Sequence, residues 1–128
     1  MIFALVLAAG GPADAPWDCK EPMPQQEMNY CAAVEYDKVD AALNVQWKLT
    51  AAAMKQRDDG RDATYDQRPG YFATLLDGQR AWLKYRDAHC RSEGYYARGG
   101  SLESLLVSTC RTKLTEQRTQ QLQFLIEQ

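Results

Sequence analysis

Four cysteines constrain the fold of this chain more than any other feature of its sequence. They stand at positions 19, 31, 90 and 110 of 128 residues. Four cysteines in a short chain from an oxidising compartment form two disulfides, with three possible pairings. We expect the most local pairing, Cys19 with Cys31 and Cys90 with Cys110. In the chain-entropy model each of these short loops stabilises the fold by about 3 kcal/mol.

The N-terminal residues are typical of a secretory signal peptide. Residues 1–9 read MIFALVLAA, an apolar run too short to span a bilayer, and the small, turn-prone residues GGPADAP follow. We therefore expect a signal peptide over residues 1–15, cleaved at its end or a few residues earlier, and a single domain over residues 16–128. The residues before Cys19 lack the small-residue run of a lipid-anchor site. The sequence thus predicts a periplasmic or secreted protein without a membrane anchor.

Three stretches have the periodicity of amphipathic helices. Apolar residues recur at steps of three and four over residues 25–57, over residues 71–91, and from Ser101 to near the C-terminus. No stretch shows the alternation of a strand, and no repeat or low-complexity tract is present. The sequence therefore predicts an all-α fold, a small bundle of three main helices stapled by the two disulfides.

Two loops separate the predicted helices. Residues 58–70 combine glycine, proline and many charges, and residues 94–100, GYYARGG, carry three glycines that can adopt positive φ. Ser101 then follows as a candidate N-cap, with Glu103 in the first turn of the third helix. Gly78 inside the second helix costs about 1 kcal/mol relative to alanine. We expect its missing side chain to let another helix approach closely.

Two arginines lie on the apolar sides of their predicted helices. Arg86 falls on the stripe of the second helix and Arg118 on that of the third, where a charge is costly unless it is paired and hydrogen-bonded. We expect at least one of them to reach a carboxylate or amide of the first helix, and the alternative is an arginine that binds an anionic ligand. The candidate partners are Asp40, Asn44, Glu27 and Glu35. Trp47 and Trp82 also stand on apolar stripes, and we expect them in the core rather than on a binding surface.

No constellation in the sequence indicates catalysis or a cofactor. His89 stands beside Cys90, but neighbours on a helix point about 100° apart, and a disulfide would consume the thiol. A single histidine without a C-x2-C pair does not make a familiar zinc site, and no phosphate-binding glycine loop or nucleophile elbow is present. The formal net charge of −2 argues against a general nucleic-acid binder. We expect a non-enzymatic protein without metal, cofactor or nucleic-acid partner.

Several segments together form a family signature. They are EMNYCAAVEYDKVDAALN at 27–44, QRAWLKYRDAHC at 79–90, GGS at 99–101, Cys110, and LTEQRTQQL at 114–122. In order and spacing they resemble the LprI-type domain family of bacterial envelope proteins, from about Cys19 to Leu122. The resemblance implies a helical, disulfide-bonded domain in the periplasm or outside the cell, and it suggests lysozyme inhibition, although many members have no assigned activity. The lipid anchor of the name-giving lipoprotein does not carry over to this chain.

The resemblance points to an interaction protein of the lysozyme-inhibitor type, and the second loop is the candidate partner-binding segment. Inhibition requires a protrusion that enters a substrate cleft carrying catalytic carboxylates. Tyr95 and Tyr96 offer aromatic surface for burial, and Arg98 offers a guanidinium for a carboxylate. The alternative for the loop is a plain helix connection. The alternative for the protein is a non-enzymatic binding module for an envelope protein or cell-wall fragment, with no lysozyme involved.

Overall fold

The regular structure of the described chain is helical. A computed structural model describes residues 17–21 and 24–128, so the expected signal peptide over residues 1–15 lies outside the described residues. The elements are α1 (Gln25–Asp59), α2 (Tyr71–Gly94), the short 3-10 helix η2 (Tyr95–Ala97) and α3 (Glu103–Glu127). The expected all-α fold with three main helices is confirmed. None of the described helices combines the length and apolar character that a bilayer crossing needs.

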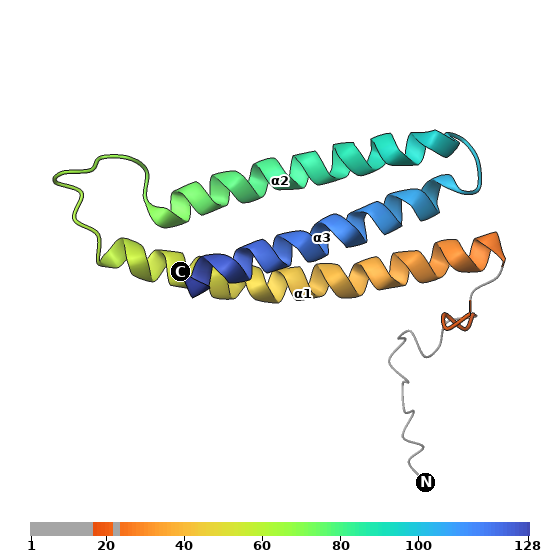
Figure 1. Ribbon diagram of the computed structural model, residues 1–128, viewed down its shortest axis with the longest axis horizontal. Coiled ribbons are helices and arrows are strands. Elements are labelled where there is room, and N and C mark those ends of the chain that lie inside the picture. Colours follow the sequence, from red (N-terminus) through yellow and green to blue (C-terminus); the bar gives the residue numbers. More distant parts are fainter. Residues whose placement is uncertain (1–16, 22–23) are drawn as a thin grey trace, which may run out of the picture.

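The three helices lie along one another, with α1 and α3 parallel and α2 antiparallel to both (Figure 1). At one end, the Asn29 side chain of α1 donates to the Ser101 carbonyl just before α3, at 2.8 Å. At the other end, Arg57 of α1 donates to the Leu125 carbonyl of α3, at 3.1 Å. These bonds tie the matching ends of the two parallel helices together.

Asp58 connects the end of α1 to the start of α2. The sequence predicts that a loop begins at Asp58, but this is wrong, because α1 continues to Asp59. The Asp58 carboxylate accepts the backbone N–H groups of Tyr71 at 2.7 Å and Phe72 at 3.0 Å. The first N–H groups of a helix have no partners within the helix, and its N-terminus carries partial positive charge. A carboxylate from α1 therefore caps α2 across the intervening loop.

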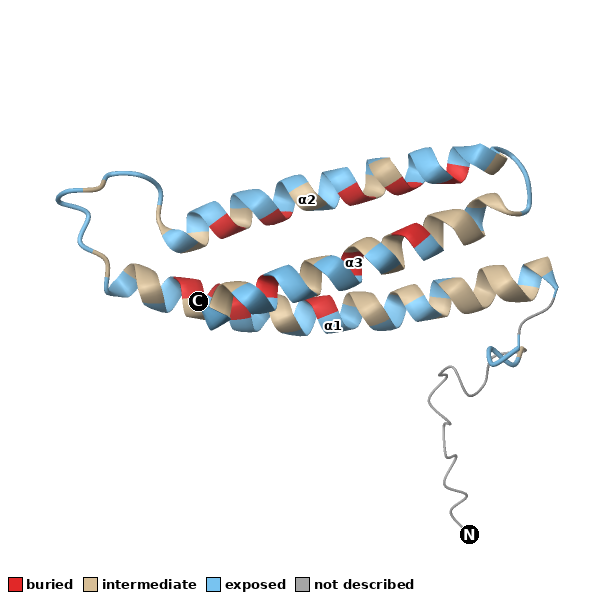
Figure 2. Ribbon diagram, in the orientation of Figure 1, coloured by how far each residue is buried: buried red, intermediate tan, exposed pale blue. Residues whose placement is uncertain are grey.

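The hydrophobic core lies along the line where the three helices face one another (Figure 2). Its buried members are Leu43, Met54, Leu75 and Leu122, and the residues packed against them are Trp47, Phe72, Trp82 and Leu125. Both tryptophans thus pack at the edge of the core. Thr50 is fully buried as well, and its hydroxyl donates to the Leu122 carbonyl at 2.9 Å. A polar bond therefore crosses the apolar contact between α1 and α3.

Both disulfides have the expected pairing. Cys19 is bonded to Cys31 and Cys90 to Cys110, each pair with its Cα atoms 5.4 Å apart. The first bond ties the lead-in segment to the opening turns of α1. The second ties the last turns of α2 to α3, beneath the connection between them. Trp17, in the same lead-in, packs edge-on against Tyr30 with ring centroids 5.2 Å apart.

The connection between α2 and α3 differs from the sequence prediction. Ser101 is not the N-cap of α3, because the helix begins at Glu103, and no side chain forms a capping bond there. Helix α2 also continues past residue 91 to Gly94. Among the described glycines only Gly99 has a positive φ, of 79°. The connection is therefore a short helical turn in which one of the three glycines adopts a left-handed conformation.

Gly94, rather than Gly78, is the glycine at the closest approach of two helices. A Cβ atom placed on Gly94 would lie 2.5 Å from Cγ2 of Val107 in α3. A Cβ atom on Gly78 would come no nearer than 3.9 Å to a side-chain atom, the Nη2 of Arg118. Only the first distance requires a residue without a side chain.

Candidate functional site

Arg86 is the centre of a polar network that joins all three helices. Its Nη1 lies 3.5 Å from Oδ1 of Asp40 in α1 and donates to the Thr115 hydroxyl of α3 at 3.4 Å. Its Nε donates to Asp87 at 3.1 Å. The Arg86 side chain is only 8% exposed, so its charge is held by neighbours that the fold supplies. The arginine is buried and its two carboxylate partners are partly exposed, so the guanidinium already has acceptors within the fold.

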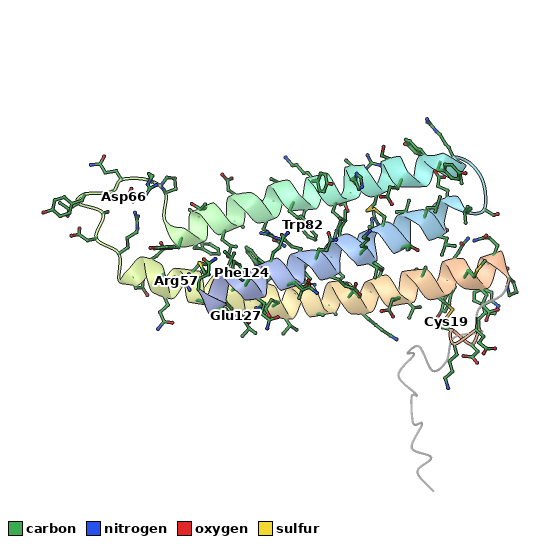
Figure 3. All side chains as sticks on the ribbon, in the orientation of Figure 1. Cys19, Arg57, Asp66, Trp82, Phe124 and Glu127 are labelled. Atoms are coloured by element: carbon green, nitrogen blue, oxygen red, sulfur yellow. A yellow bond between two sulfur atoms is a disulfide. The ribbon has the colours of Figure 1, made fainter. Side chains whose placement is uncertain are left out.

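Aromatic rings complete the surroundings of the Arg86 guanidinium. Its carbon lies 5.1 Å from the ring centroid of Trp82 and 5.5 Å from that of Tyr36, within the range of cation–π attraction. Figure 3 labels Trp82 on the side of α2 that faces α3. Arg111 of α3 approaches the same Tyr36 ring at 5.8 Å. Burial raises the pKa of the Tyr36 hydroxyl, although Arg86 opposes the shift.

Arg118 is held by amides instead of carboxylates. Its Nε donates to Oε1 of Gln79 in α2 at 2.8 Å, and its Nη1 donates to Oε1 of Gln121 at 3.2 Å. Burial lowers the pKa of the Arg118 guanidinium. No ion pair with a carboxylate forms at Arg118 within residues 17–21 and 24–128. The structure therefore leaves this half-buried cation without an opposite charge.

The expected arginine partners on α1 fall into two groups. Asp40 faces Arg86 across the α1–α2 contact. The side chain of Asn44 is exposed and that of Glu27 half-buried, and in the described part of the chain neither bonds to Arg86 or Arg118. Glu35 is likewise exposed. The structure thus brings one of the candidate partners to an arginine.

The segment between α2 and α3, residues 95–102, forms a protruding turn that we call the α2–α3 turn. Tyr96 is 89% exposed and Tyr95 is 44% exposed. The Arg98 guanidinium lies over the Tyr95 ring, 4.4 Å from its centroid. Backbone bonds from Arg98 to the Tyr95 carbonyl and from Gly100 to the Ala97 carbonyl fix the turn. Two tyrosines and one guanidinium are therefore displayed together at one end of the bundle.

A group of possible metal ligands lies beneath this turn. His89, Glu93 and Cys110 place ligand atoms within 4.8 Å of one another. Cys110 is bonded to Cys90, so its sulfur is not a thiolate ligand. The remaining pair, His89 Nε2 and Glu93 Oε1 at 3.1 Å, forms an ordinary contact between residues one helical turn apart.

The sequence analysis missed a second feature, at the opposite end of the bundle. A cavity of about 670 Å³ opens between the last turns of α1 and α3, the first turns of α2, and the loop of residues 60–70. Its lining includes Arg57, Arg61, Arg68 and Arg118. Three of these arginines lie within twelve residues of sequence, and this cluster of positive charge could have indicated the site. The fourth comes from α3, and only the fold brings it to the others.

These observations define a class of protein, a three-helix domain held by two disulfides, with a buried arginine between the helices and an aromatic turn at one end. Comparison with protein families gives its relationship. The family model described as "Lysozyme inhibitor LprI" matches residues 18–122. The chain belongs to this LprI family, as its sequence motifs indicate.

A relative in Rhizobium meliloti (strain 1021) is also similar along nearly its whole length. The chain is 40% identical over 131 residues to "Uncharacterized protein R02472" of that organism, covering 98% of this chain and 92% of the relative. No solved structure matches the chain. The comparisons therefore establish the family, and they leave the specific activity to be argued from the structure.

Proposed function

We propose that this protein is a periplasmic or secreted, non-enzymatic interaction protein that inhibits a lysozyme. Membership of the family described as "Lysozyme inhibitor LprI" supports the activity. The two disulfides support the location, because such bonds form and persist in oxidising compartments outside the cytoplasm. The inhibitory surface in this proposal is the α2–α3 turn.

The observation that carries the proposal is the display of Tyr96 and Arg98 on a turn with a rigid base. A lysozyme cleft holds two catalytic carboxylates flanking the scissile bond, with subsites that accept sugar rings. The exposed Tyr96 ring could fill such a subsite, since tyrosine buries much surface at low entropic cost. Arg98 has a planar guanidinium, which matches a carboxylate in charge and geometry.

Pre-organisation favours this turn as a binding element. The Cys90–Cys110 disulfide and the close packing of Gly94 on Val107 hold the two helices immediately below it. Arg98 rests on Tyr95 and forms no ion pair within the described residues. Binding would therefore cost little ordering of the backbone, and no internal carboxylate would have to be displaced from Arg98.

Titration of the oxidised protein into several lysozyme types acting on cell walls tests the activity directly. The expected result is inhibition of at least one type at near-stoichiometric amounts, together with a complex detected by size-exclusion chromatography. Absence of inhibition and of complex formation with every type would contradict the proposal.

A second candidate function, a binding module for an envelope protein or cell-wall fragment, is favoured by the arginine-lined cavity at the other end. The same titration separates the two functions. A protein that leaves every lysozyme fully active but retains a cell-wall fragment or an envelope protein would support the module and not the inhibitor.

A further inference from the structure

The cavity at the end of the bundle opposite the α2–α3 turn has the size of a small-ligand site. Its volume is about 670 Å³, within the roughly 300–1,000 Å³ that small-molecule pockets span. All three helices and the loop of residues 60–70 contribute to its wall. Figure 3 labels Arg57 on α1 and Asp66 on the loop at this end of the bundle. The site is thus distant along the helices from Tyr96 and Arg98 and independent of any role of the turn.

The charge of the lining side chains is strongly one-sided. Arg57, Arg61, Arg68 and Arg118 line the cavity, and Asp66 is the one acidic side chain among the lining residues. Arg68 donates two hydrogen bonds to the Asp66 carboxylate and so lowers its pKa. This pair neutralises itself. Arg57, Arg61 and Arg118 are the other guanidiniums at the cavity, in a protein whose formal net charge is −2.

Internal carbonyl and amide oxygens hold two of these guanidiniums in place. Arg61 donates to the backbone carbonyls of Asp66 and Arg68, at 3.3 and 3.1 Å, and Arg118 donates to the amides of Gln79 and Gln121. Arg57 donates to the Leu125 carbonyl at 3.1 Å and to Gln128 at 3.3 Å. Neutral acceptors thus orient Arg61 and Arg118 without cancelling their charge. The positive potential at the cavity is therefore preorganised for an anion.

Arg118 is the strongest single indication that the cavity suits an anion. Like Arg57 and Arg61 it is half-buried, and burial lowers its pKa because the charged form has lost water. Its Nε and Nη1 are engaged by glutamine amides, and its Nη2 lies beside the open backbone of Gly78. A partly desolvated cation gains most from an opposite charge that enters the site.

Part of the remaining wall is apolar. Met54 and Leu75 are buried members of the core and also line the cavity, and Leu125 packs against them. Tyr71 lines it as well and is 48% exposed. A ligand that filled the cavity would thus meet both guanidiniums and aliphatic or aromatic groups.

We propose that this cavity binds a small amphipathic anion, a ligand with a carboxylate or phosphate group joined to a short apolar portion. An arginine guanidinium donates two parallel hydrogen bonds to either a carboxylate or a phosphate. The apolar part of the wall accommodates the attached hydrocarbon. The cavity is a site separate from the α2–α3 turn, so this proposal does not depend on lysozyme inhibition.

Calorimetry with matched amphiphiles tests the proposal. The probes are octanoate, octyl phosphate and octyltrimethylammonium, which share a chain length and differ in head group, each below its micelle concentration. The expected result is that at least one anionic probe binds about tenfold or more tightly than the cation, and less tightly as salt is raised. Which anion binds better distinguishes a carboxylate ligand from a phosphate ligand. Equal affinity for anion and cation, or no binding of either anion, would overturn the proposal.

Two variants locate the binding to this cavity. Arg118→Gln removes one half-buried charge and is expected to weaken anion binding about tenfold, whereas Arg91→Gln, at the far end of α2, is the matched control. Gly78→Leu keeps every charge but fills the cavity from an exposed helix position, and leucine is a better helix former than glycine. A folded Gly78→Leu protein is expected to lose binding. Parent-like affinity in that variant would overturn the assignment, whether or not Arg118→Gln folds.

Discussion

Arg86 of α2 lies 3.5 Å from Asp40 of α1, with its side chain 8% exposed. The same guanidinium also contacts Thr115 of α3, so one charged group joins the three helices. Removing it would leave polar neighbours without a partner and an apolar gap beneath Trp82. We therefore propose that the Arg86–Asp40 contact stabilises the fold.

Arg86→Met tests this role. It should lower the free energy of unfolding by about 2 kcal/mol, equivalent to a fall in Tm of roughly 5–10 °C for a domain of this size. Thermal unfolding followed by circular dichroism measures the change. Arg80→Met, at an exposed position of the same helix, should change Tm little. An unchanged Tm in Arg86→Met would mean that the network does not stabilise the fold.

Two buried threonine hydroxyls should respond oppositely to the same substitution. Thr50 donates to the Leu122 carbonyl at 2.9 Å, whereas the buried hydroxyl of Thr112 has no hydrogen-bond partner within the described chain. Thr50→Val should cost about 1 kcal/mol, and Thr112→Val should be neutral or stabilising. Denaturant unfolding of both variants measures the difference. Equal losses in the two would contradict the assigned bonding.

The two helical glycines provide a second matched pair. Gly94→Ala places its Cβ 2.5 Å from Val107, and this overpacking should cost about 1–3 kcal/mol. Gly78→Ala meets no atom nearer than 3.9 Å and should gain up to about 1 kcal/mol from helix propensity. Chemical denaturation decides between them. A stabilised Gly94→Ala protein would show that α2 and α3 are not so closely packed there.

The two disulfides should differ in reactivity. Cys19 is exposed, whereas Cys90 and Cys110 are 0% and 7% exposed. Limited reductant followed by alkylation and peptide mapping should label Cys19 and Cys31 first. Replacing Cys90 and Cys110 by alanine should cost about 3 kcal/mol in the chain-entropy model. Preferential labelling of Cys90 would contradict the burial of the second bond.

The sequence was sufficient for features that depend on local spacing. Helical periodicity gave the three helices, and short loop length gave the disulfide pairing. The position of Arg86 on an apolar stripe pointed to a carboxylate or amide partner on α1, where Asp40 stands. The helices and disulfides depend on residues that are close in sequence. The partner of Arg86 was predictable because a buried charge is costly unless it is paired.

Features that depend on tertiary contacts were not predictable from the sequence. The Ser-x-Glu pattern at 101–103 favours an N-cap, yet the Ser101 carbonyl bonds to Asn29 of α1 and the helix starts two residues later. Asp58 caps α2 across a loop, and Arg118 pairs with Gln79 on another helix. The arginine-lined cavity was not predictable for the same reason, because its wall comes from three helices and a loop that only the fold brings together.

The most direct test of the proposed function compares Tyr96→Ala and Arg98→Ala with matched controls in the lysozyme titration. Tyr65→Ala, at a 93% exposed tyrosine in the loop at the opposite end, controls for loss of an exposed aromatic ring, and Arg91→Ala controls for loss of charge. If the α2–α3 turn enters the lysozyme cleft, Tyr96→Ala and Arg98→Ala should each weaken inhibition about tenfold or more, while the controls inhibit like the parent. Folded Tyr96→Ala and Arg98→Ala proteins that inhibit as well as the parent would contradict the role of the turn.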